Sequence, residues 1–198
     1  MSRTAIIVLV ALGAALAGFA FSSTADRLRD EDGGESPGAS VAAGPQEADL
    51  DWRETYGPAG EQVVFRVESL AVTETGWTAR LGLENTTSIA YAAGDPRATL
   101  DRSFGLMLFS SGELEDLERR NAERTLPAVR AATSYEPELP AILEPGASWE
   151  GTIAAPGALV AGSWVRVVFG TLTAVGKTPE GLDEQIVWIT DSAHRLEP

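Results

Sequence analysis

The only histidine of the chain is the first residue to examine for catalytic chemistry. His194 lies four residues from the C-terminus. A Ser-His-acid triad would have to be built on this residue, because the triad needs a histidine held beside its nucleophile. Chain termini are usually poorly ordered, so we expect His194 to be an exposed residue of a frayed end. We therefore predict that the chain is not an enzyme.

Metal and nucleotide sites are restricted by the same composition. With one histidine and no cysteine, the chain cannot build a site from several His or Cys ligands, and it contains no P-loop or dinucleotide fingerprint. We predict no cofactor and assign no metal ligands. An all-oxygen calcium site stays open because carboxylates are abundant, although the acidic run at residues 30–35 lacks the EF-hand spacing. Paired carboxylates for glycoside hydrolysis also stay open, since their pairing is spatial.

Five tryptophans are the remaining candidates for ligand contact. Tryptophan in a strand usually packs in the core or at its edge, whereas sugar-binding sandwiches expose a row of such rings. If Val165, Val167 and Phe169 point toward the core, Trp164 points outward. Core packing is our main expectation for these rings, and Trp164 is the candidate for a glycan platform. The five are Trp52, Trp77, Trp149, Trp164 and Trp188.

Short runs that alternate between apolar and polar residues predict the strands that would position these side chains. Val63, Phe65 and Val67 share one face of the first run, and Arg66 and Glu68 share the other. Similar runs occupy residues 79–84, 104–108, 149–153, 165–169 and 186–190. Runs with this period of two indicate half-buried antiparallel strands. Six or seven such strands suggest a β-sandwich.

Turn residues separate several of these runs. Glu74-Thr75-Gly76 and Glu144-Pro145-Gly146 predict two hairpin turns. Residues 126–142 are predicted to form an irregular loop, because the three prolines in this segment prevent regular pairing. A loop of this length is typically functional or mobile.

One helix is predicted within the β pattern, at residues 112–120. Ser110 and Glu113 fit a capping box at its start. Two pairs of opposite charge, four residues apart, would stabilise it. The pairs are Glu115 with Arg119 and Asp116 with Arg120. Leu114 and Leu117 would seat the helix on the sandwich, and docking of a partner on these leucines is the alternative.

The strand ends and turns of this pattern resemble a bacterial envelope family. The similar segments are Val67-Glu68-Ser69-Leu70, residues 81–86 and Leu143-Glu144-Pro145-Gly146, followed by Gly151, Ile153 and Pro156. They span most of residues 62–190. Members of this family are immunoglobulin-like β-sandwich domains, usually tethered by a lipid or a helix. Many are domains of unknown function near the immunoprotective secreted-protein superfamily. The resemblance implies an immunoglobulin-like fold and a location in the cell envelope, and it implies no catalytic residues. The predicted helix around Leu117 and the lack of a lipid-acceptor cysteine depart from the commonest form.

The chain is strongly acidic, with 29 Asp and Glu against 15 Lys and Arg and a formal net charge of -14. Only one of the basic residues, Lys177, is a lysine. An acidic surface repels phosphate backbones and anionic lipid headgroups. We therefore exclude nucleic acid as a partner. A charge of this size is typical of a solubilising surface or of adaptation to a salty medium.

The N-terminal segment carries the clearest functional signal. No charged residue occurs between Arg3 and Asp26, and residues 5–21 form an apolar stretch of 17 residues. A membrane-spanning helix needs about 17–25 residues, whereas the apolar part of a secretory signal has about 7–15. Length therefore favours a retained anchor that contacts the membrane through residues 4–25. The small residues Ser23-Thr24-Ala25 keep cleavage after Ala25 open.

These features divide the chain into three parts. Residues 1–25 are a membrane anchor or signal segment, and residues 26–50 are an acidic disordered tether. Residues 51–198 are an all-β, immunoglobulin-like antiparallel β-sandwich with one short inserted helix. The charges that flank the anchor nearly balance, and we place the N-terminus inside because the domain is large and acidic. We expect a single-pass membrane protein with its C-terminal domain outside the cytoplasm, secreted if cleaved.

The expected function is non-enzymatic protein interaction or ligand binding outside the cytoplasm. An envelope protein or a glycan is the expected partner, and the candidate contact residues are Trp164, Leu114 and Leu117. A carbohydrate-binding or weakly carbohydrate-active envelope protein is the alternative. A purely structural protein of a high-salt envelope is a third hypothesis.

Overall fold

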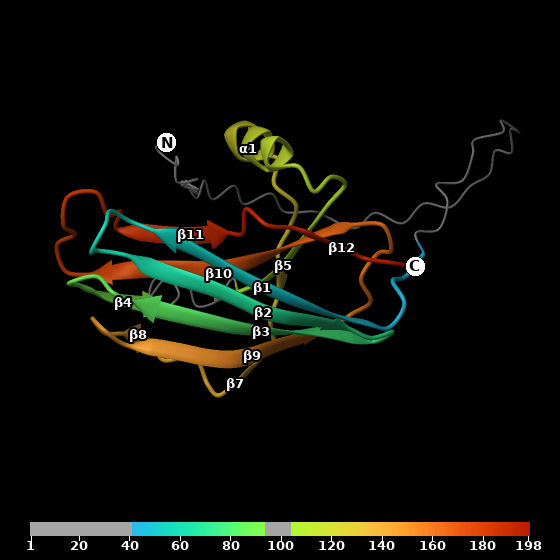
Figure 1. The fold of residues 1–198 in the computed structure, drawn as a ribbon, viewed down its shortest axis with the longest axis horizontal. Coiled ribbons are helices and arrows are strands. Elements are labelled where there is room, and N and C mark those ends of the chain that lie inside the picture. Colours follow the sequence, from blue (N-terminus) through green and yellow to red (C-terminus); the bar gives the residue numbers. More distant parts are fainter. Residues whose placement is uncertain (1–40, 94–103) are drawn as a thin grey trace, which may run out of the picture.

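The computed structural model describes residues 41–93 and 104–198. Within these ranges the chain forms two antiparallel β-sheets and one short helix (Figure 1). The predicted anchor at residues 1–25 and most of the predicted tether lie outside the described residues. In the part of the chain that the structure describes, no helix is long and apolar enough to cross a membrane.

The first sheet has five strands in the order β1-β2-β3-β9-β7. Their bounds are β1 Gln46–Tyr56, β2 Val63–Val72, β3 Gly76–Asn85, β9 Ser148–Pro156 and β7 Ser134–Glu136. The predicted turn at residues 74–76 joins β2 and β3 as a hairpin, and the Thr73 amide donates to the Gly76 carbonyl at 2.9 Å. This hairpin sets the register in which Val67 lies opposite Leu81.

The second sheet is organised around one long strand, β10 (Trp164–Val175). One edge of β10 pairs with β5 and β4, and the other edge pairs with β12 and β11. Two short strands extend the sheet, with β6 paired to β5 and β8 paired to β4. The bounds are β4 Ala90–Ala93, β5 Gly105–Phe109, β6 Arg130–Ala131, β8 Ile142–Leu143, β11 Gln185–Ile189 and β12 His194–Arg195.

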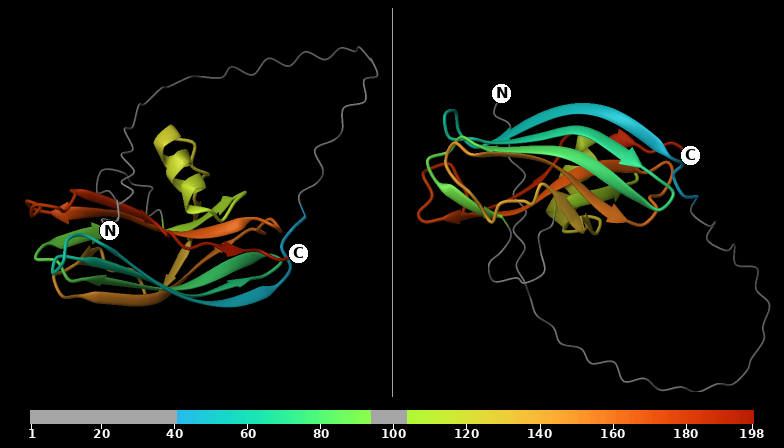
Figure 2. Two further views of the ribbon diagram at one scale, coloured as in Figure 1. Left: turned by 45° about the horizontal axis from the view of Figure 1, so that its top comes forward. Right: turned by 90° about the horizontal axis from the view of Figure 1, so that it is seen from below.

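The main hydrophobic core lies between the two sheets (Figure 2). Phe65 of β2 contacts Phe169 of β10 with a ring-centre distance of 5.0 Å, and it stacks on Trp188 of β11 at 5.1 Å. Both faces of β10 are buried, because a second, smaller core covers its outer face. Two stacked antiparallel sheets around one core confirm the all-β prediction and are consistent with a sandwich.

All six predicted strand runs coincide with strands of the structure, and their predicted core-facing residues are mostly buried. The prediction was incomplete at the N-terminal side, where β1 begins inside the segment predicted as tether. Ala43 is buried, and Ala42 forms a bridge with Val160. The residues from Ala42 on therefore belong to the domain and not to the predicted tether. Strand β1 escaped prediction because its inward positions include Gln46 and Ala48, so its alternation is weakly hydrophobic.

The strand order refines the predicted architecture. In an antibody-type domain the third strand of the chain crosses to the opposite sheet. Here β1, β2 and β3 are consecutive in the chain and adjacent in one sheet. The order of these three strands therefore differs from that of an antibody-type domain.

The segment predicted as an irregular loop forms three short strands that alternate between the sheets. Strand β6 pairs in the second sheet, β7 in the first and β8 in the second. The prediction of an irregular loop was therefore wrong in part, because the prolines lie between or before these strands instead of within them. The turn at residues 144–146 is present, since the Ala147 amide donates to the Glu144 carbonyl at 3.0 Å. It joins β8 and β9 in different sheets and is not a hairpin.

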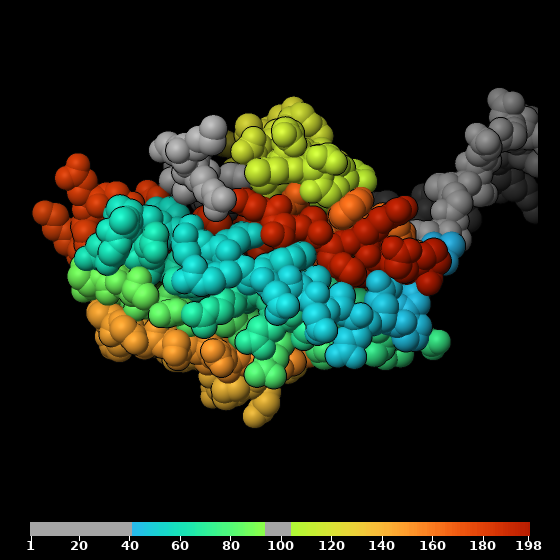
Figure 3. Space-filling view, viewed as in Figure 1, coloured from blue at the N-terminus to red at the C-terminus, as the bar shows by residue number. Residues whose placement is uncertain are grey.

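Helix α1 (Leu114–Glu123) projects from the outer face of the second sheet (Figure 3). Its N-cap is Glu113 and makes no side-chain cap hydrogen bond, so the predicted capping box is wrong. Instead, Ser110 accepts a hydrogen bond from the Arg120 guanidinium at 3.3 Å. The predicted pair of Asp116 and Arg120 is present at 2.9 Å. Arg119 pairs with Asp116 and Glu123 instead of Glu115.

Asp51 provides a test of the β1 geometry. The pairing of β1 with β2 shifts between Asp49 and Trp52, and Asp51 has a φ of 49°. A β-branched side chain is disfavoured at this backbone angle. We expect Asp51→Val to lower the free energy of unfolding by roughly 1–2 kcal/mol, measured by urea denaturation. The control Asp49→Val should change it by less than about 0.5 kcal/mol. Equal losses in the two variants would contradict the positive φ of Asp51.

Candidate functional site

The two ends of the sheets differ in what they hold. The first described residues and the C-terminus lie at the same end (Figure 1). There the Gln46 side chain donates to the Glu197 carbonyl at 3.1 Å, and the Glu197 amide donates back to Gln46 at 3.1 Å. We call this the proximal end, because the chain enters the domain here.

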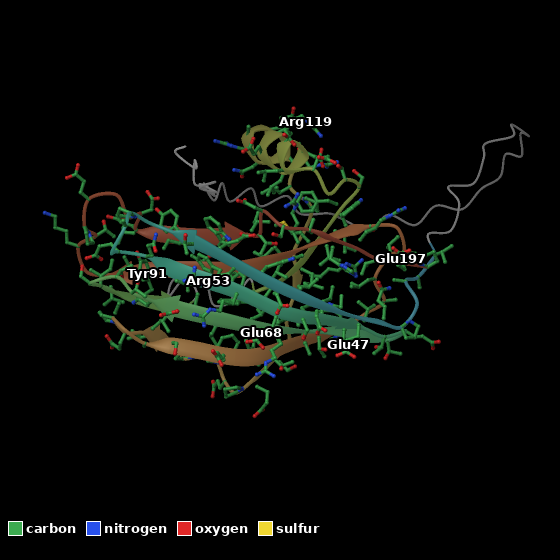
Figure 4. The ribbon with its side chains drawn as sticks, viewed as in Figure 1. Glu47, Arg53, Glu68, Tyr91, Arg119 and Glu197 are labelled. Carbon is green, nitrogen blue, oxygen red and sulfur yellow. The ribbon has the colours of Figure 1, made fainter. Side chains whose placement is uncertain are left out.

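Four connections lie at the opposite end, which we call the distal end. They are residues 57–62, 86–89, 144–147 and 176–184. Figure 4 places Tyr91 toward this end, and Glu47 and Glu197 toward the other. Each of the long strands β1, β2, β3, β9 and β10 runs between the two ends, so the strand direction alone fixes which loops meet.

Side-chain hydrogen bonds join the distal loops to one another. The Tyr56 hydroxyl donates to the Asp183 carboxylate, and the Asp183 amide donates to the same hydroxyl at 3.1 Å. The Glu61 carboxylate accepts from the Ser88 amide at 2.6 Å and from the Ser88 hydroxyl at 3.1 Å. These bonds connect the loop at residues 57–62 to the loop at residues 86–89, and the loop at residues 176–184 to the end of β1.

Gly57 lets two of these loops approach closely. Its φ is 108°, and a Cβ atom there would lie 2.2 Å from the Glu61 carbonyl and 2.9 Å from the Leu182 side chain. Gly181 in turn lies against Pro58, where an added Cβ would be 3.4 Å from the ring. The first and last distal loops are therefore packed together, and any larger residue at position 57 would separate them.

Asn85 fixes the other side of the distal end. Its buried amide donates to the Leu143 carbonyl at 3.0 Å and to the Ile89 carbonyl at 2.8 Å. Its carbonyl oxygen accepts from the amide and the hydroxyl of Thr87. This asparagine matches a glycosylation sequon in sequence, but its amide is fully engaged and inaccessible, so the match has a structural explanation.

Two tyrosines lie beneath this surface. Burial, and then the hydrogen bond to Asp183, raise the pKa of Tyr56. Burial, followed by the charges of Asp183 and Glu61, raises the pKa of Tyr91 to about 12. The Tyr91 hydroxyl is buried and has no hydrogen-bond partner within the described residues. A buried hydroxyl without a hydrogen-bond partner lowers the stability of the fold by about 1–3 kcal/mol, unless a bound ligand interacts with it.

Trp164 faces outward as predicted, but its ring is covered by the chain itself. It is half-buried and packs with the second core on the outer face of β10. A Cβ added at Gly112 would lie 2.5 Å from the ring, so this glycine rests on it. The remaining rings pack against the main core. Trp77, Trp149 and Trp188 are buried, and Trp52 is half-buried.

The two leucines of α1 have different surroundings. Leu117 is fully buried against Met107, Phe109, Val168 and Ile189 of the second core. Leu114 is 36% exposed. Leu117 is therefore the buried apolar contact between the helix and the sheet, and Leu114 stays available for contact. The structure does not bring Trp164, Leu114 and Leu117 together into one exposed surface.

Arg166 is a buried residue that sequence analysis assigned to no site. Its guanidinium donates to the carbonyls of Thr190 and Gly112 at 2.8 Å each, to Glu113 at 3.1 Å and to Asp191. Burial lowers the pKa of Arg166, and the charge of Asp191 opposes this effect. Val168 lies on the same outer face of β10 as Arg166. An apolar residue at this position indicates from the sequence that the face is covered.

The C-terminal segment is also ordered by specific contacts. The Glu54 carboxylate accepts from the Trp188 indole at 2.7 Å and from the amides of Asp191 and Ser192 at 3.0 and 3.1 Å. Residues beyond this point form β12, in which His194 pairs with Val165. The prediction of a frayed terminus at His194 was therefore wrong. Leu196 is buried and anchors the end, a contact that local composition does not reveal.

Comparisons add no further assignment. Among residues 41–93 and 104–198, no group of three or more His, Cys, Asp or Glu side chains could hold a metal ion. Searches against protein-family models, curated proteins and solved structures give no match to this chain.

Arg166 can be tested by a substitution of similar length. Arg166→Met leaves four backbone carbonyls without their donor, so we expect the free energy of unfolding to fall by roughly 2–4 kcal/mol. The matched control is Arg53→Met on the exposed face of β1, with an expected change below about 0.5 kcal/mol. Urea denaturation followed by tryptophan emission measures both. Wild-type stability of the Arg166 variant would show that these carbonyls do not depend on it.

The tyrosines predict a loss of stability at alkaline pH. Since the folded pKa of Tyr91 is raised from 10.0 to about 12, the folded chain keeps this tyrosine neutral where the unfolded chain ionises it. The stabilisation is complete below pH 10.0 and is lost as the pH rises toward about 12. We expect Tyr91→Phe to reduce the slope of unfolding free energy against pH in this interval. An unchanged slope would contradict the burial of this hydroxyl.

Proposed function

We propose that this chain is a membrane-tethered, extracytoplasmic module that binds a partner without catalysis. The observation that carries the proposal is the opposition of the two ends. The chain enters the domain at the proximal end, and four loops joined by hydrogen bonds and close packing form the distal end. A tether at the proximal end would turn the distal loops away from the membrane. Such loops on a rigid scaffold are common binding elements.

The anchor and the fold family belong to the same proposal. Residues 4–25 would contact or cross the membrane, and the residues that follow, up to about position 41, would connect them to the domain. The domain would be a relative of the immunoglobulin-like envelope modules whose turns it resembles. The stacked sheets support this relation, and the consecutive order of β1, β2 and β3 distinguishes the chain from antibody-type domains.

Protein or small-ligand binding accounts for the structure better than glycan binding does. A glycan platform would use an exposed tryptophan face, but Gly112 packs against the ring of Trp164 and covers it. Leu114 on α1 remains exposed for a protein partner. The carbohydrate alternative would therefore need a site other than the one that the sequence indicated.

Lys177 offers a direct test of the proposed location outside the cytoplasm. It is the only lysine of the chain and is exposed in the distal loop at residues 176–184. We expect a membrane-impermeant amine reagent to label the protein in intact cells, because Lys177 would lie outside the cytoplasm. The control Lys177→Arg keeps the charge and should remain unlabelled. Labelling of Lys177 only after cell lysis would contradict the proposed orientation.

The binding role is tested by moving this lysine. In cells treated with an impermeant amine-reactive cross-linker, the wild-type protein should form a defined adduct through Lys177. The double variant Lys177→Arg, Arg195→Lys places the lysine at the exposed proximal strand β12 with unchanged charge. We expect the adduct to be reduced at least about tenfold in this variant, since an amine-directed cross-linker reacts only within its span. Equal cross-linking from both ends would contradict a distal binding surface.

A further inference from the structure

The distal end gathers negative charge without matching positive charge. Glu61, Asp183 and three further acidic residues lie in its four loops, where Lys177 is the only basic residue. Within the described chain, neither Glu61 nor Asp183 forms an ion pair, whereas several charges on the face of the first sheet are paired, as in Arg66 with Glu84 at 2.7 Å. The distal acids therefore concentrate a negative potential at one place.

Acidic loops alone do not define a site, but Tyr91 supplies an independent observation. Its side chain is fully buried, and its hydroxyl has no hydrogen-bond partner within the described residues. A phenylalanine would fill the same volume without leaving a polar atom unsatisfied. The presence of the hydroxyl is therefore explained best by a bound ligand that interacts with its oxygen atom.

The backbone pairing brings Tyr91 near the segments that carry the two carboxylates. Tyr91 lies opposite Ala174 in β10, and the Ala174 amide donates to the Glu184 carbonyl at 2.8 Å, next to Asp183. On the other side, Ser88 lies three residues before Tyr91 and binds the Glu61 carboxylate. Both carboxylates act on Tyr91 electrostatically. Gly57 and Pro58 bring the two loops that carry these acids into contact.

We propose that the distal end binds one divalent cation of the calcium type between Glu61 and Asp183, with the Tyr91 hydroxyl as an additional oxygen ligand. Carboxylates, neutral oxygens and water are the ligands that calcium prefers. The inference goes beyond the proposed binding role and does not depend on the membrane anchor. It also identifies the all-oxygen site that the spacing of acids in the sequence did not select.

The ligand set limits the affinity. No three acidic or histidine side chains converge anywhere in the described chain, so this site would have two carboxylates at most. Backbone carbonyls and water would complete the shell. Calcium sites of extracellular modules bind at about 10⁻⁴–10⁻³ M, and a site with two carboxylates belongs in this range. Tyr91 would act as a neutral ligand, because its hydroxyl stays protonated at neutral pH.

The experiment measures thermal unfolding of the full-length protein in detergent after removal of metal with a chelator. Because the net charge is -14, any salt screens repulsion, so CaCl₂ at about 10 mM is compared with NaCl of equal ionic strength. We expect calcium to raise the midpoint by about 3–8 °C beyond NaCl. Magnesium should have a smaller effect, since it demands stricter octahedral geometry.

Variants separate a specific site from screening. Tyr91→Phe and Glu61→Gln should each lose most of the calcium-specific rise, while Glu180→Gln, which removes a distal charge outside the site, should keep it. Asp183→Asn also removes the acceptor of Tyr56, so Tyr91→Phe is the decisive variant. Equal effects of calcium and NaCl, or a full calcium effect in Tyr91→Phe, would overturn the proposal. Either result would leave the labelling and cross-linking outcomes for Lys177 unchanged.

Discussion

Strand β10 is hydrogen-bonded along both edges and buried on both faces, and the other elements of the domain are arranged around it. Val167 and its inward neighbours pack against the first sheet, while Arg166 and Val168 face the second core beneath α1. The ends of β10 reach the proximal turn and the distal loop. One strand therefore positions the sheet, the helix and the candidate site, because a change in its register would move all three.

The strongest strand patterns were predictable because they follow from burial of one face. Val63, Phe65 and Val67 alternate with charged residues, and β2 forms where this pattern predicts it. Strand β1 was missed because Gln46 and Ala48 weaken the same signal. The helix was found, but its cap was not, because Ser110 bonds to Arg120 instead of to the helix start. Local pattern therefore identified elements better than it identified their ends.

The candidate site was not predictable from local sequence, because distant segments build it. Tyr56 and Asp183 are 127 positions apart, and Glu61 and Ser88 are 27 apart. Sequence analysis assigned Arg166 to no site, since a charged residue in an alternating strand usually faces water. Its partners are backbone carbonyls, which carry no signal in the side-chain pattern. Trp164 was correctly placed outward, but no local sequence pattern indicates that Gly112 packs on its ring.

The central claim is that the distal loops and β10 form one cooperative unit. Hydrogen exchange resolved to single amides of the full-length protein tests it most directly. The Ser88 amide donates to the Glu61 side chain of another distal loop, and the Asp183 amide donates to the Tyr56 hydroxyl at the end of β1. The account therefore predicts that both amides exchange nearly as slowly as the amides of β10, through global unfolding. Exchange of these two amides at the rate of unprotected loops, while β10 remains protected, would contradict it.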